Sequence, residues 1–371
     1  MKKLLYKLYA FLFNISAVIF PVKENRIAFV SMHNENFRDS LGNVYERLKR
    51  ENRYDFVLIT REDLSVKKPL KVFSFFFIKS RLLATSKYVF LNDNFMPMGK
   101  MNFSKSAVIT QLWHGEGAFK KFGLHIPQPE DLRKREIAAN RKLTYVVCSS
   151  EGVRRIYAEA FGVEEIRVLP LGAPRLDYLA DESNKAEAKK KILALYPEAK
   201  DKKIILYAPT FRDDEERDGA LLDSFSDEKL LNELGEEYFL FIRLHPQIHT
   251  ADAEFKAAAD VTDYEDVREL ILVSDILITD YSSICMDFCA LDKKTVFYCP
   301  DLSRYRERRD FYFDYEAFVP GRVCKNFEDL AEAVKAPFCE ERNSKFKKMN
   351  FDYTDTQNTD RVIKAVMGLS Q

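Results

Sequence analysis

Short apolar runs alternate with longer amphipathic stretches along most of the chain. The runs predicted as strands lie at 27–31, 56–60, 88–91, 107–112, 145–148 and 167–169, and again at 203–207, 239–244, 276–279 and 295–298. The stretches between them have the spacing of apolar residues that is typical of helices. Because strands that alternate with helices favour parallel sheets, the pattern predicts an α/β protein with two Rossmann-like domains.

A helical segment at 176–202, rich in Ala, Lys, Glu and Asp, separates the two sets of strands. We take it as the boundary between an N-terminal domain at 23–180 and a C-terminal domain at 181–371. Ligands of such sheets bind beyond the carboxyl ends of the strands, so the residues after each strand are the first candidates for a site. The chain has no G-x-G-x-x-G or Walker loop, which disfavours a dinucleotide dehydrogenase or a P-loop enzyme.

Residues 1–22 are predicted as a helix of a different kind. Three lysines lie in the first seven residues, and an apolar, aromatic-rich run follows at 8–20. That run is short for a bilayer span of about 20 residues, and no small-residue cleavage site of a signal peptide precedes Pro21. A basic start with aromatic residues favours an anchor helix at the membrane interface. A helix packed on the protein's own core is the alternative, and the sequence leaves both open.

Composition narrows the class of protein further. With 371 residues, 46% hydrophobic and 31% charged, the chain has the composition of a globular protein and not of a disordered or collagen-like one. Its net charge is zero, yet residues 1–180 carry +12 and residues 181–371 carry −12. This split suggests that the first half meets an acidic partner. The basic, aromatic stretch 305–316 resembles a base-stacking surface, but no RNA-binding motif accompanies it, so no nucleic-acid partner is expected.

The six cysteines are scattered and show no C-x-x-C spacing. We therefore expect reduced, mostly buried thiols in a cytoplasmic protein, with no closed metal site.

The segment 111–123 carries the densest chemistry of the first half. An apolar strand runs into a glycine-spaced turn that holds His114, Gly115, Lys120 and Lys121. Glycine lets backbone amides approach a ligand, an imidazole accepts a proton near neutral pH, and lysines attract an anion. Taken alone, the segment would more often be a basic surface loop after a strand.

Four segments of the second half also follow predicted strands or precede helices. In chain order they contain Thr210 and Arg212; Arg243 and His245; Asp280, Ser282, Ser283 and Asp287; and the block 305–316. Serine hydroxyls and amides at a helix N-terminus form an anion site that suits a diphosphate. The alternatives are a plain N-cap at the two serines and a surface carboxylate at Asp287.

In this order, the five segments resemble the CDP-glycerol glycerophosphotransferase family, which includes teichoic acid primases and polymerases. The shared motifs are Trp-His-Gly at 113–115 with paired lysines downstream, Tyr-Ala-Pro-Thr at 207–210, Arg-x-His-Pro at 243–246, Thr-Asp-Tyr-Ser-Ser at 279–283 and an aromatic block at 311–316. The chain departs from the usual pattern where Glu116 follows the Trp-His-Gly turn, where Asp310 replaces a glycine and where Arg322 replaces a proline. Residues 1–110 carry little of the pattern beyond Gly42-Asn43, expected in a turn.

The resemblance implies a GT-B fold, whose two Rossmann-like domains have parallel sheets facing a central cleft, with the acceptor mainly on the first domain and a CDP-activated donor mainly on the second. An acceptor hydroxyl would attack the donor's β-phosphorus and CMP would leave. The implied catalytic residues are His114, as general base, and His245. The implied donor-binding residues are Thr210, Arg212, Arg243, His245, Asp280, Ser282, Ser283 and Asp287, and those for the acceptor or transferred phosphate are Gly115, Lys120 and Lys121.

The expected reaction moves glycerol phosphate, or another polyol phosphate such as ribitol phosphate, to a cell-surface glycan or teichoic-acid-like acceptor. The expected location is the cytoplasmic side, peripheral at the inner face of the cell membrane. No cofactor is expected beyond Mg²⁺ that could accompany the donor diphosphate. The alternatives are a GT-B glycosyltransferase that uses a nucleotide sugar in cell-surface polysaccharide synthesis, a nucleotide-sugar epimerase, and a non-enzymatic polyanion-binding or membrane-adaptor protein.

Overall fold

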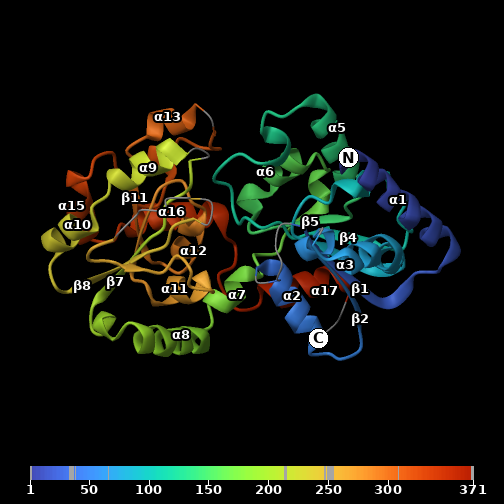
Figure 1. Cartoon of the computed structure of the whole chain (residues 1–371), viewed down its shortest axis with the longest axis horizontal. Coiled ribbons are helices and arrows are strands. Elements are labelled where there is room, and N and C mark those ends of the chain that lie inside the picture. The colour runs from blue at the N-terminus through green and yellow to red at the C-terminus, as the bar shows by residue number, and fades with distance from the viewer. Residues whose placement is uncertain are drawn as a thin grey trace. The chain divides into compact units, whose positions relative to one another are not determined.

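The computed structural model describes residues 2–368 except 33–36, 38, 66, 213–214, 246–247, 249–254 and 308. The chain forms two compact units (Figure 1). Unit 1 comprises Met1–Gly117, Phe122–Asp177 and Asn350–Gln371, and unit 2 comprises Ala118–Lys121 and Tyr178–Met349. Each unit is an α/β structure built on one parallel sheet.

The sheet of unit 1 has the strand order β2-β1-β3-β4-β5-β6, and every neighbouring pair is parallel. Its strands are β1 (Lys23–Ser31), β2 (Asp55–Thr60), β3 (Ser86–Leu91), β4 (Val108–Gln111), β5 (Tyr145–Cys148) and β6 (Val168–Pro170). All six coincide with predicted runs to within a few residues. The parallel arrangement predicted for the first half is therefore confirmed.

Unit 1 also contains the following helices. They are α1 (Lys2–Ile19), α2 (Ser40–Lys49), η1 (Arg61–Leu64), α3 (Pro69–Ser74), the π-helix η2 (Phe75–Lys79), α4 (Ser80–Ala84), η3 (Met96–Lys100), η4 (Gly123–His125), α5 (Glu130–Asn140), α6 (Glu151–Phe161), η5 (Glu165–Arg167) and α17 (Asn358–Met367), with α7 (Arg175–Leu179) at the crossing into unit 2. Gly42 and Asn43 lie inside α2, so the turn expected there is wrong: Asn43 Nδ2 donates instead to Pro174 O at 2.6 Å.

The C-terminal helix α17 belongs to unit 1 and not to unit 2. It packs beside α2, as Figure 1 also shows, and buries Val362 and Ile363 in the same core as Ile27 of β1. The carboxylate of Asp177 accepts hydrogen bonds from the first backbone amides of the helix, including Asn358 N at 2.8 Å. The expectation of a single domain over 181–371 is therefore wrong for its end, because an amphipathic helix does not specify which sheet it covers.

The sheet of unit 2 has the order β12-β11-β10-β7-β8-β9 and is also parallel throughout. Its strands are β7 (Lys203–Tyr207), β8 (Tyr238–Ile242), β9 (Ala259–Asp260), β10 (Ile276–Thr279), β11 (Lys294–Tyr298) and β12 (Arg322–Cys324). The four central strands coincide with predicted runs. The two edge strands, β9 of two residues and β12 of three, were not predicted.

The helices of unit 2 are α8 (Glu182–Leu195), η6 (Pro197–Ala199), α9 (Glu215–Asp223), α10 (Asp227–Leu234), α11 (Val267–Val273), α12 (Ile284–Ala290), α13 (Leu302–Arg306), α14 (Tyr315–Phe318), α15 (Glu328–Lys335) and α16 (Glu340–Asn350). Aromatic stacking fills part of the core, as between Tyr207 and Phe225 with ring centroids 3.9 Å apart. All six cysteines are free thiols and only Cys339 is exposed, as expected for scattered, mostly buried cysteines.

Candidate active site

The histidine of the Trp-His-Gly motif lies just beyond the carboxyl end of β4 in unit 1. Trp113 takes φ +60°, a left-handed conformation, and its amide donates to Gln111 Oε1 at 2.9 Å. The Trp113 ring packs on that of His114, with centroids 4.1 Å apart. The His114 side chain is 46% exposed. This turn therefore presents an imidazole to solvent from a fixed backbone.

A second strand end holds the same imidazole. His114 Nδ1 lies 3.2 Å from Asp93 Oδ1 and 3.2 Å from Asn92 O. Both residues directly follow β3, the neighbour of β4 in the sheet. Neither residue was predicted as part of the site, although both follow a predicted strand, and ligands of such sheets bind beyond the carboxyl ends of strands.

The two glycines after His114 are fixed by polar contacts within unit 1. Tyr157 of α6 donates its hydroxyl hydrogen bond to Gly115 O at 2.7 Å, and Gly117 N donates to Ser149 Oγ at 2.9 Å. Only Gly117 has a positive φ, at +64°, where a Cβ would also lie 2.5 Å from Asn350 Oδ1. The special backbone position of the motif is therefore Gly117, whereas Gly115 was the predicted site residue.

The motif is divided between the two units. Its next residues, Ala118–Lys121, belong to unit 2, where Lys120 forms an antiparallel bridge with Phe311 and Lys121 N donates to Asp310 O at 3.0 Å. Lys121 Nζ forms an ion pair with the Asp310 carboxylate, and this hydrogen bond holds the pKa of Asp310 below its usual range. His114, the candidate base, therefore belongs to unit 1, whereas Lys120 and Lys121, only a few residues further along the chain, belong to unit 2.

Lys120 lies among other cationic side chains of unit 2. It is half-buried and forms no salt bridge with any residue that the structure describes. Burial lowers the pKa of Lys120, and the positive charge of Arg309 lowers it further. Burial and the charge of Lys120 likewise lower the pKa of His245, whose ring packs on Phe211 at 4.5 Å. Such a cluster of cations favours binding of an anion.

The predicted donor residues lie at the ends of neighbouring strands. The segments after β8, β7, β10 and β11 hold Arg243 and His245, Thr210 and Arg212, Asp280 to Ser283, and Asp301, respectively. Because these four strands are adjacent in the sheet order, the segments lie along one edge. The structure thus brings together, within unit 2, segments that are far apart in sequence.

Some of these residues are buried in an ionic cluster below that edge. Arg212 Nη2 lies 2.8 Å from Asp280 Oδ2, and Arg212 Nε donates to Asp301 Oδ2 at 2.7 Å. The Asp280 carboxylate also accepts from Thr210 N at 2.8 Å. Arg212 and Asp280 are almost fully buried. Their polar atoms bind each other and the strand-end segments, which this cluster holds in place.

The other predicted donor residues differ in their accessibility. Arg243 Nη1 donates to Val261 O and Tyr264 O at 2.9 and 2.6 Å, so it holds the segment after β9. Ser283 is exposed and makes no side-chain capping bond. Ser282 is half-buried, and its Oγ accepts from Ile284 N at 3.4 Å, so the N-cap alternative stays open at Ser282. The Asp287 side chain is buried in α12, so the surface carboxylate alternative is wrong, and its burial does not support contact with a donor ribose.

Within the described residues, no group of three or more His, Cys, Asp or Glu side chains is arranged to hold a metal ion. A magnesium ion that accompanies the donor diphosphate stays a prediction.

Two parallel six-strand sheets, with polar segments gathered at the carboxyl ends of the strands, define a GT-B-like α/β protein. The chain belongs to the CDP-Glycerol:Poly(glycerophosphate) glycerophosphotransferase family, whose family model matches residues 12–368. This confirms the predicted family and fold class, and also the class of enzyme, a glycerophosphotransferase-like transferase.

Two relatives show how far the similarity extends. The chain is 33% identical over 376 residues to the teichoic acid poly(ribitol-phosphate) polymerase of Bacillus spizizenii. This alignment covers 99% of this chain and 60% of that protein. It is 32% identical to the teichoic acid ribitol-phosphate primase of the same organism, over 87% of this chain and 85% of that protein. The chain therefore spans three fifths of the polymerase and most of the primase.

Solved structures agree with this assignment. The structure of the wall teichoic acid polymerase TagF superposes with a TM-score of 0.75 at 25% identity, over 98% of this chain and 91% of that chain. The UDP-GlcNAc 2-epimerase of Neisseria meningitidis superposes with a TM-score of 0.55 at 13% identity, over 93% of this chain and 100% of that chain, which shows the fold alone.

Proposed function

We propose that this chain transfers a polyol phosphate, glycerol phosphate or ribitol phosphate, from a CDP-activated donor to a teichoic-acid-like or other cell-surface glycan acceptor. The observation that carries the proposal is the orientation of His114. Its Nδ1 faces two oxygen acceptors, Asp93 Oδ1 and Asn92 O, at 3.2 Å. A proton on Nδ1 makes Nε2 the ring nitrogen that accepts the proton of an acceptor hydroxyl.

The chemistry follows from that assignment. His114 takes the hydroxyl proton as the acceptor oxygen bonds to the donor's β-phosphorus. The bond from that phosphorus to the bridging oxygen of the diphosphate breaks, and the electron pair leaves with CMP. Lys120, His245 and the segment Ser282–Ser283 of unit 2 stabilise the negative charge on the phosphoryl oxygens. Burial and the charge of Lys120 lower the pKa of His245 and so favour its neutral imidazole, which can donate a hydrogen bond to phosphate.

Calorimetric titration with CDP-glycerol, CDP-ribitol and UDP-N-acetylglucosamine tests the donor class. We expect binding of a CDP-polyol and none of the UDP-sugar. In the Lys120→Met variant we expect the CDP-polyol affinity to fall by about tenfold, the equivalent of roughly 1.4 kcal/mol. The substitution removes a half-buried ammonium that would neutralise the charge of the donor diphosphate.

Lys121→Met is the matched control, since Lys121 is the next residue and already pairs with Asp310. Its donor affinity should change by less than about twofold. Binding of the UDP-sugar alone would place the protein among sugar transferases. Equal losses in the two lysine variants would contradict the assignment of Lys120 to the donor phosphates.

The partner that we propose for unit 1 is an anionic membrane surface. Helix α1 buries Tyr9 and Phe13 against the protein, while Phe11 on its other face is 60% exposed. Tyr9 stacks on Phe75 of the neighbouring η2, where Phe77 is 51% exposed. The remaining exposed apolar side chains of the same elements are Leu4, Leu5, Leu8, Ile15, Val18 and Ile19 of α1, Leu70 and Phe73 of α3, and Ile78 of η2.

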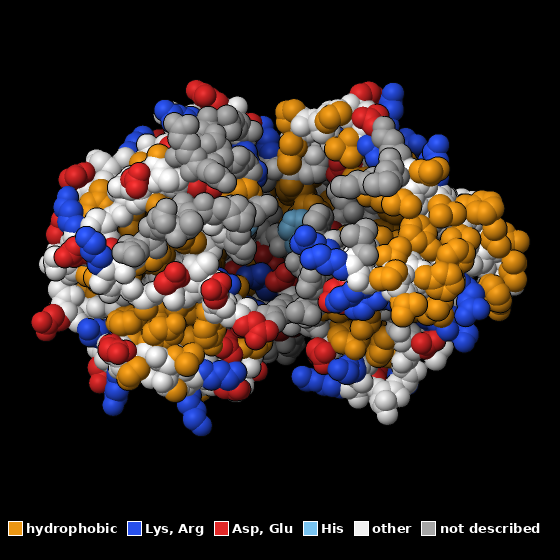
Figure 2. Space-filling view, in the orientation of Figure 1, with side chains coloured by type: hydrophobic (Ala, Val, Ile, Leu, Met, Phe, Trp, Pro, Cys, Tyr) orange, Lys and Arg blue, Asp and Glu red, His pale blue; other side chains and the backbone are white. Residues whose placement is uncertain are grey.

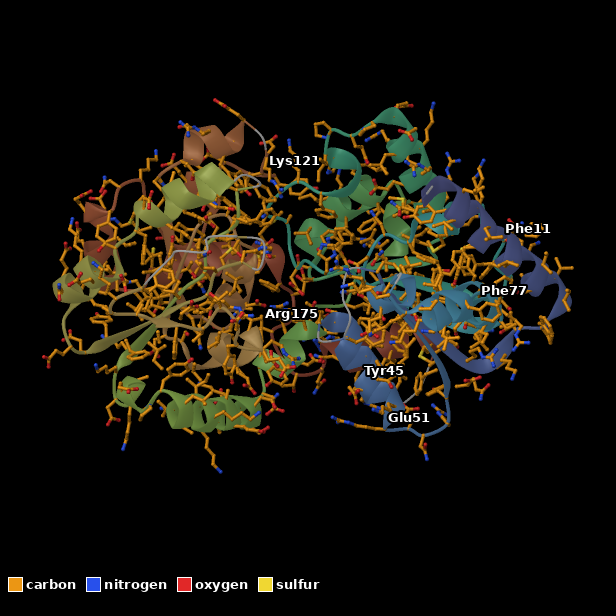
Figure 3. All side chains as sticks on the ribbon, viewed as in Figure 1. Phe11, Tyr45, Glu51, Phe77, Lys121 and Arg175 are labelled. Carbon is orange, nitrogen blue, oxygen red and sulfur yellow. The ribbon has the colours of Figure 1, made fainter. Side chains whose placement is uncertain are left out.

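These side chains form the apolar surface of unit 1, which Figure 2 shows as an orange area over α1 and the neighbouring elements. Figure 3 labels Phe11 and Phe77, which lie on that surface. Residues 2–20 and 69–84 contain lysine and arginine but no acidic residue. Acidic residues of the adjacent η1 also lie nearby, where Glu62 pairs with Lys71 and Asp63 pairs with Lys79. An apolar face whose own segments carry only basic charged residues suits the interface of an anionic bilayer. No described helix has both the length and the hydropathy needed to cross a membrane.

Flotation with vesicles of phosphatidylglycerol and phosphatidylcholine tests this partner. We expect Phe11→Asp/Phe77→Asp to lower the bound fraction by at least about tenfold, since each change places a charge in an apolar contact worth more than 1 kcal/mol. Ile166→Asp is the control, because Ile166 is 74% exposed in unit 1 but lies on η5, outside the apolar surface. A wild-type protein that stays in the bottom fraction, or an equal loss in the control, would exclude the membrane as partner.

A further inference from the structure

We infer that Asp93 is a positioning residue for the transfer reaction, which orients His114 and stabilises the positive imidazolium that forms when His114 takes the acceptor proton. This inference rests on the proposed function, in which His114 is the general base. Asp93 matches none of the motifs by which the family was recognised, and it touches the base and not the substrate.

Three neighbouring strands build the site. Asp93 is 2% exposed and lies beyond β3, His114 lies beyond β4, and Ser31 is the last residue of β1. Ser31 Oγ donates to Asp93 Oδ2 at 3.2 Å, while Asp93 Oδ1 lies 3.2 Å from His114 Nδ1. On the other side, Gln111 Nε2 donates to Asp93 O at 3.2 Å. Ser31 of β1 therefore fixes the carboxylate and Gln111 of β4 fixes the backbone of the same residue, in the sheet order β1-β3-β4.

The geometry separates two functions at the same nitrogen. Asn92 O lies as close to His114 Nδ1 as the carboxylate does, so the backbone oxygen alone can fix which ring nitrogen carries the proton. A neutral carbonyl contributes little to the stability of an imidazolium, whereas a buried carboxylate has a full negative charge in a medium of low dielectric constant. We therefore infer that both oxygens keep the proton on Nδ1 of His114, and that only Asp93 stabilises the positive charge of the imidazolium.

Glu116 lies two residues along the same turn and is partly exposed, whereas Asp93 is buried, and it is the only other titratable side chain between Trp113 and Gly117. A carboxylate that is buried and fixed has a larger effect on the imidazole than one that solvent screens. Glu116→Gln therefore serves as a charge-matched control for Asp93→Asn, since both changes remove one negative charge and keep the side-chain shape.

The test compares Asp93→Asn, Glu116→Gln and wild type by two measurements. The first is an NMR titration of the five histidine side chains, with the His114 signal assigned by its loss in His114→Asn. Removal of the Asp93 charge should lower the pKa of the imidazole by about one unit or more, and Glu116→Gln should shift it much less. The second is the pH dependence of kcat/KM with a CDP-polyol donor.

In Asp93→Asn we expect kcat to fall by about 10- to 100-fold with little change in the donor KM. The acidic limb of the kcat/KM profile should move to lower pH, because an imidazole that has lost its counter-charge gives up its proton more easily. A residue that only supports the fold would lower Tm and leave both the limb and the NMR pKa in place, which would overturn the inference. So would equal shifts in the two variants.

The two proposals fail in different ways. Absence of turnover in wild type with every CDP-polyol would refute the proposed function and leave the NMR titration as the measure of the Asp93–His114 interaction. Normal turnover in wild type with an unchanged His114 pKa in Asp93→Asn would refute the positioning role and leave the proposed function intact.

Discussion

His114→Ala is expected to lower the rate of polyol phosphate transfer by about 10³-fold, within the range of 10² to 10⁴ that a general base contributes. The physical reason is that no other group at the turn replaces an imidazole whose Nδ1 is held by Asp93 and Asn92. Because His114 is half-exposed and lies on a turn, its truncation leaves no large cavity. Stability should therefore change little.

The measurement is release of CMP from the CDP-polyol that binds most tightly, with an acceptor glycan lipid, in parallel with the calorimetric affinity for the donor. His125→Ala is the matched control. His125 lies in the same unit, on η4, and its Nε2 is 3.6 Å from Glu159 Oε2, a surface pair of small energetic weight. We expect the control to keep its rate within about twofold and both variants to bind the donor as wild type does.

Two outcomes would contradict this account. Turnover in His114→Ala close to that of wild type would exclude His114 as the base. Absence of turnover in wild type itself would favour the non-enzymatic alternative, in which the basic first half only binds a polyanion or a membrane. Loss of donor affinity together with turnover would assign His114 to donor binding, because a base for the acceptor acts only after the donor is bound.

The sequence predicted the parts of this molecule in which local pattern decides structure. Central strands such as β7 and β10 are continuous apolar runs, because a parallel sheet covered on both faces buries every side chain. The two-residue edge strand β9 leaves no such run. Helix α17 was expected in the wrong unit, since its apolar face suits either sheet and only the contacts with α2 and β1 decide.

The site was predictable only as far as each residue follows a strand. His114 and His245 were found in that way, and Asp93 would have been found by the same rule. Nothing in the sequence indicates that Gly117 and Lys120, three residues apart, belong to different units, because that division depends on the pairing of Lys120 with Phe311. The sequence also does not indicate which charged side chains are buried. Arg212 has the chemistry of a phosphate ligand, but in the structure it forms a buried ion pair with Asp280.

Arg212→Met should destabilise the protein by about 3–5 kcal/mol, which is the expected cost of breaking a buried ion pair from one side. In wild type the guanidinium contacts Asp280 Oδ2 at 2.8 Å and Asp301 Oδ2 at 2.7 Å, and its side chain is almost inaccessible to solvent. Methionine fills a similar volume but leaves two carboxylates without their counter-charge. The pair of carboxylates must then take up a proton or water, and either change weakens the segments after β10 and β11.

Urea unfolding followed by far-UV circular dichroism measures the loss, with an unchanged m-value as the condition for comparing free energies of unfolding. Arg322→Met is the control. Its guanidinium pairs with Glu332 at 2.8 Å in the same unit, but both side chains are exposed, so the expected loss is below about 1 kcal/mol. Similar losses in the two variants would show that the Arg212 cluster is not isolated from solvent.

The same substitution separates a supporting role from a binding role at the strand ends. Asp280 accepts from Thr210 N and Tyr281 N, so the cluster fixes the segments after β7 and β10 relative to each other. Arg212→Met should therefore lower stability and donor affinity together, whereas Lys120→Met should lower donor affinity and leave stability unchanged or higher, because burial and Arg309 already disfavour its charge. If Arg212→Met instead lowers donor affinity at full stability, the guanidinium itself binds the diphosphate, and the cluster opens when the donor enters.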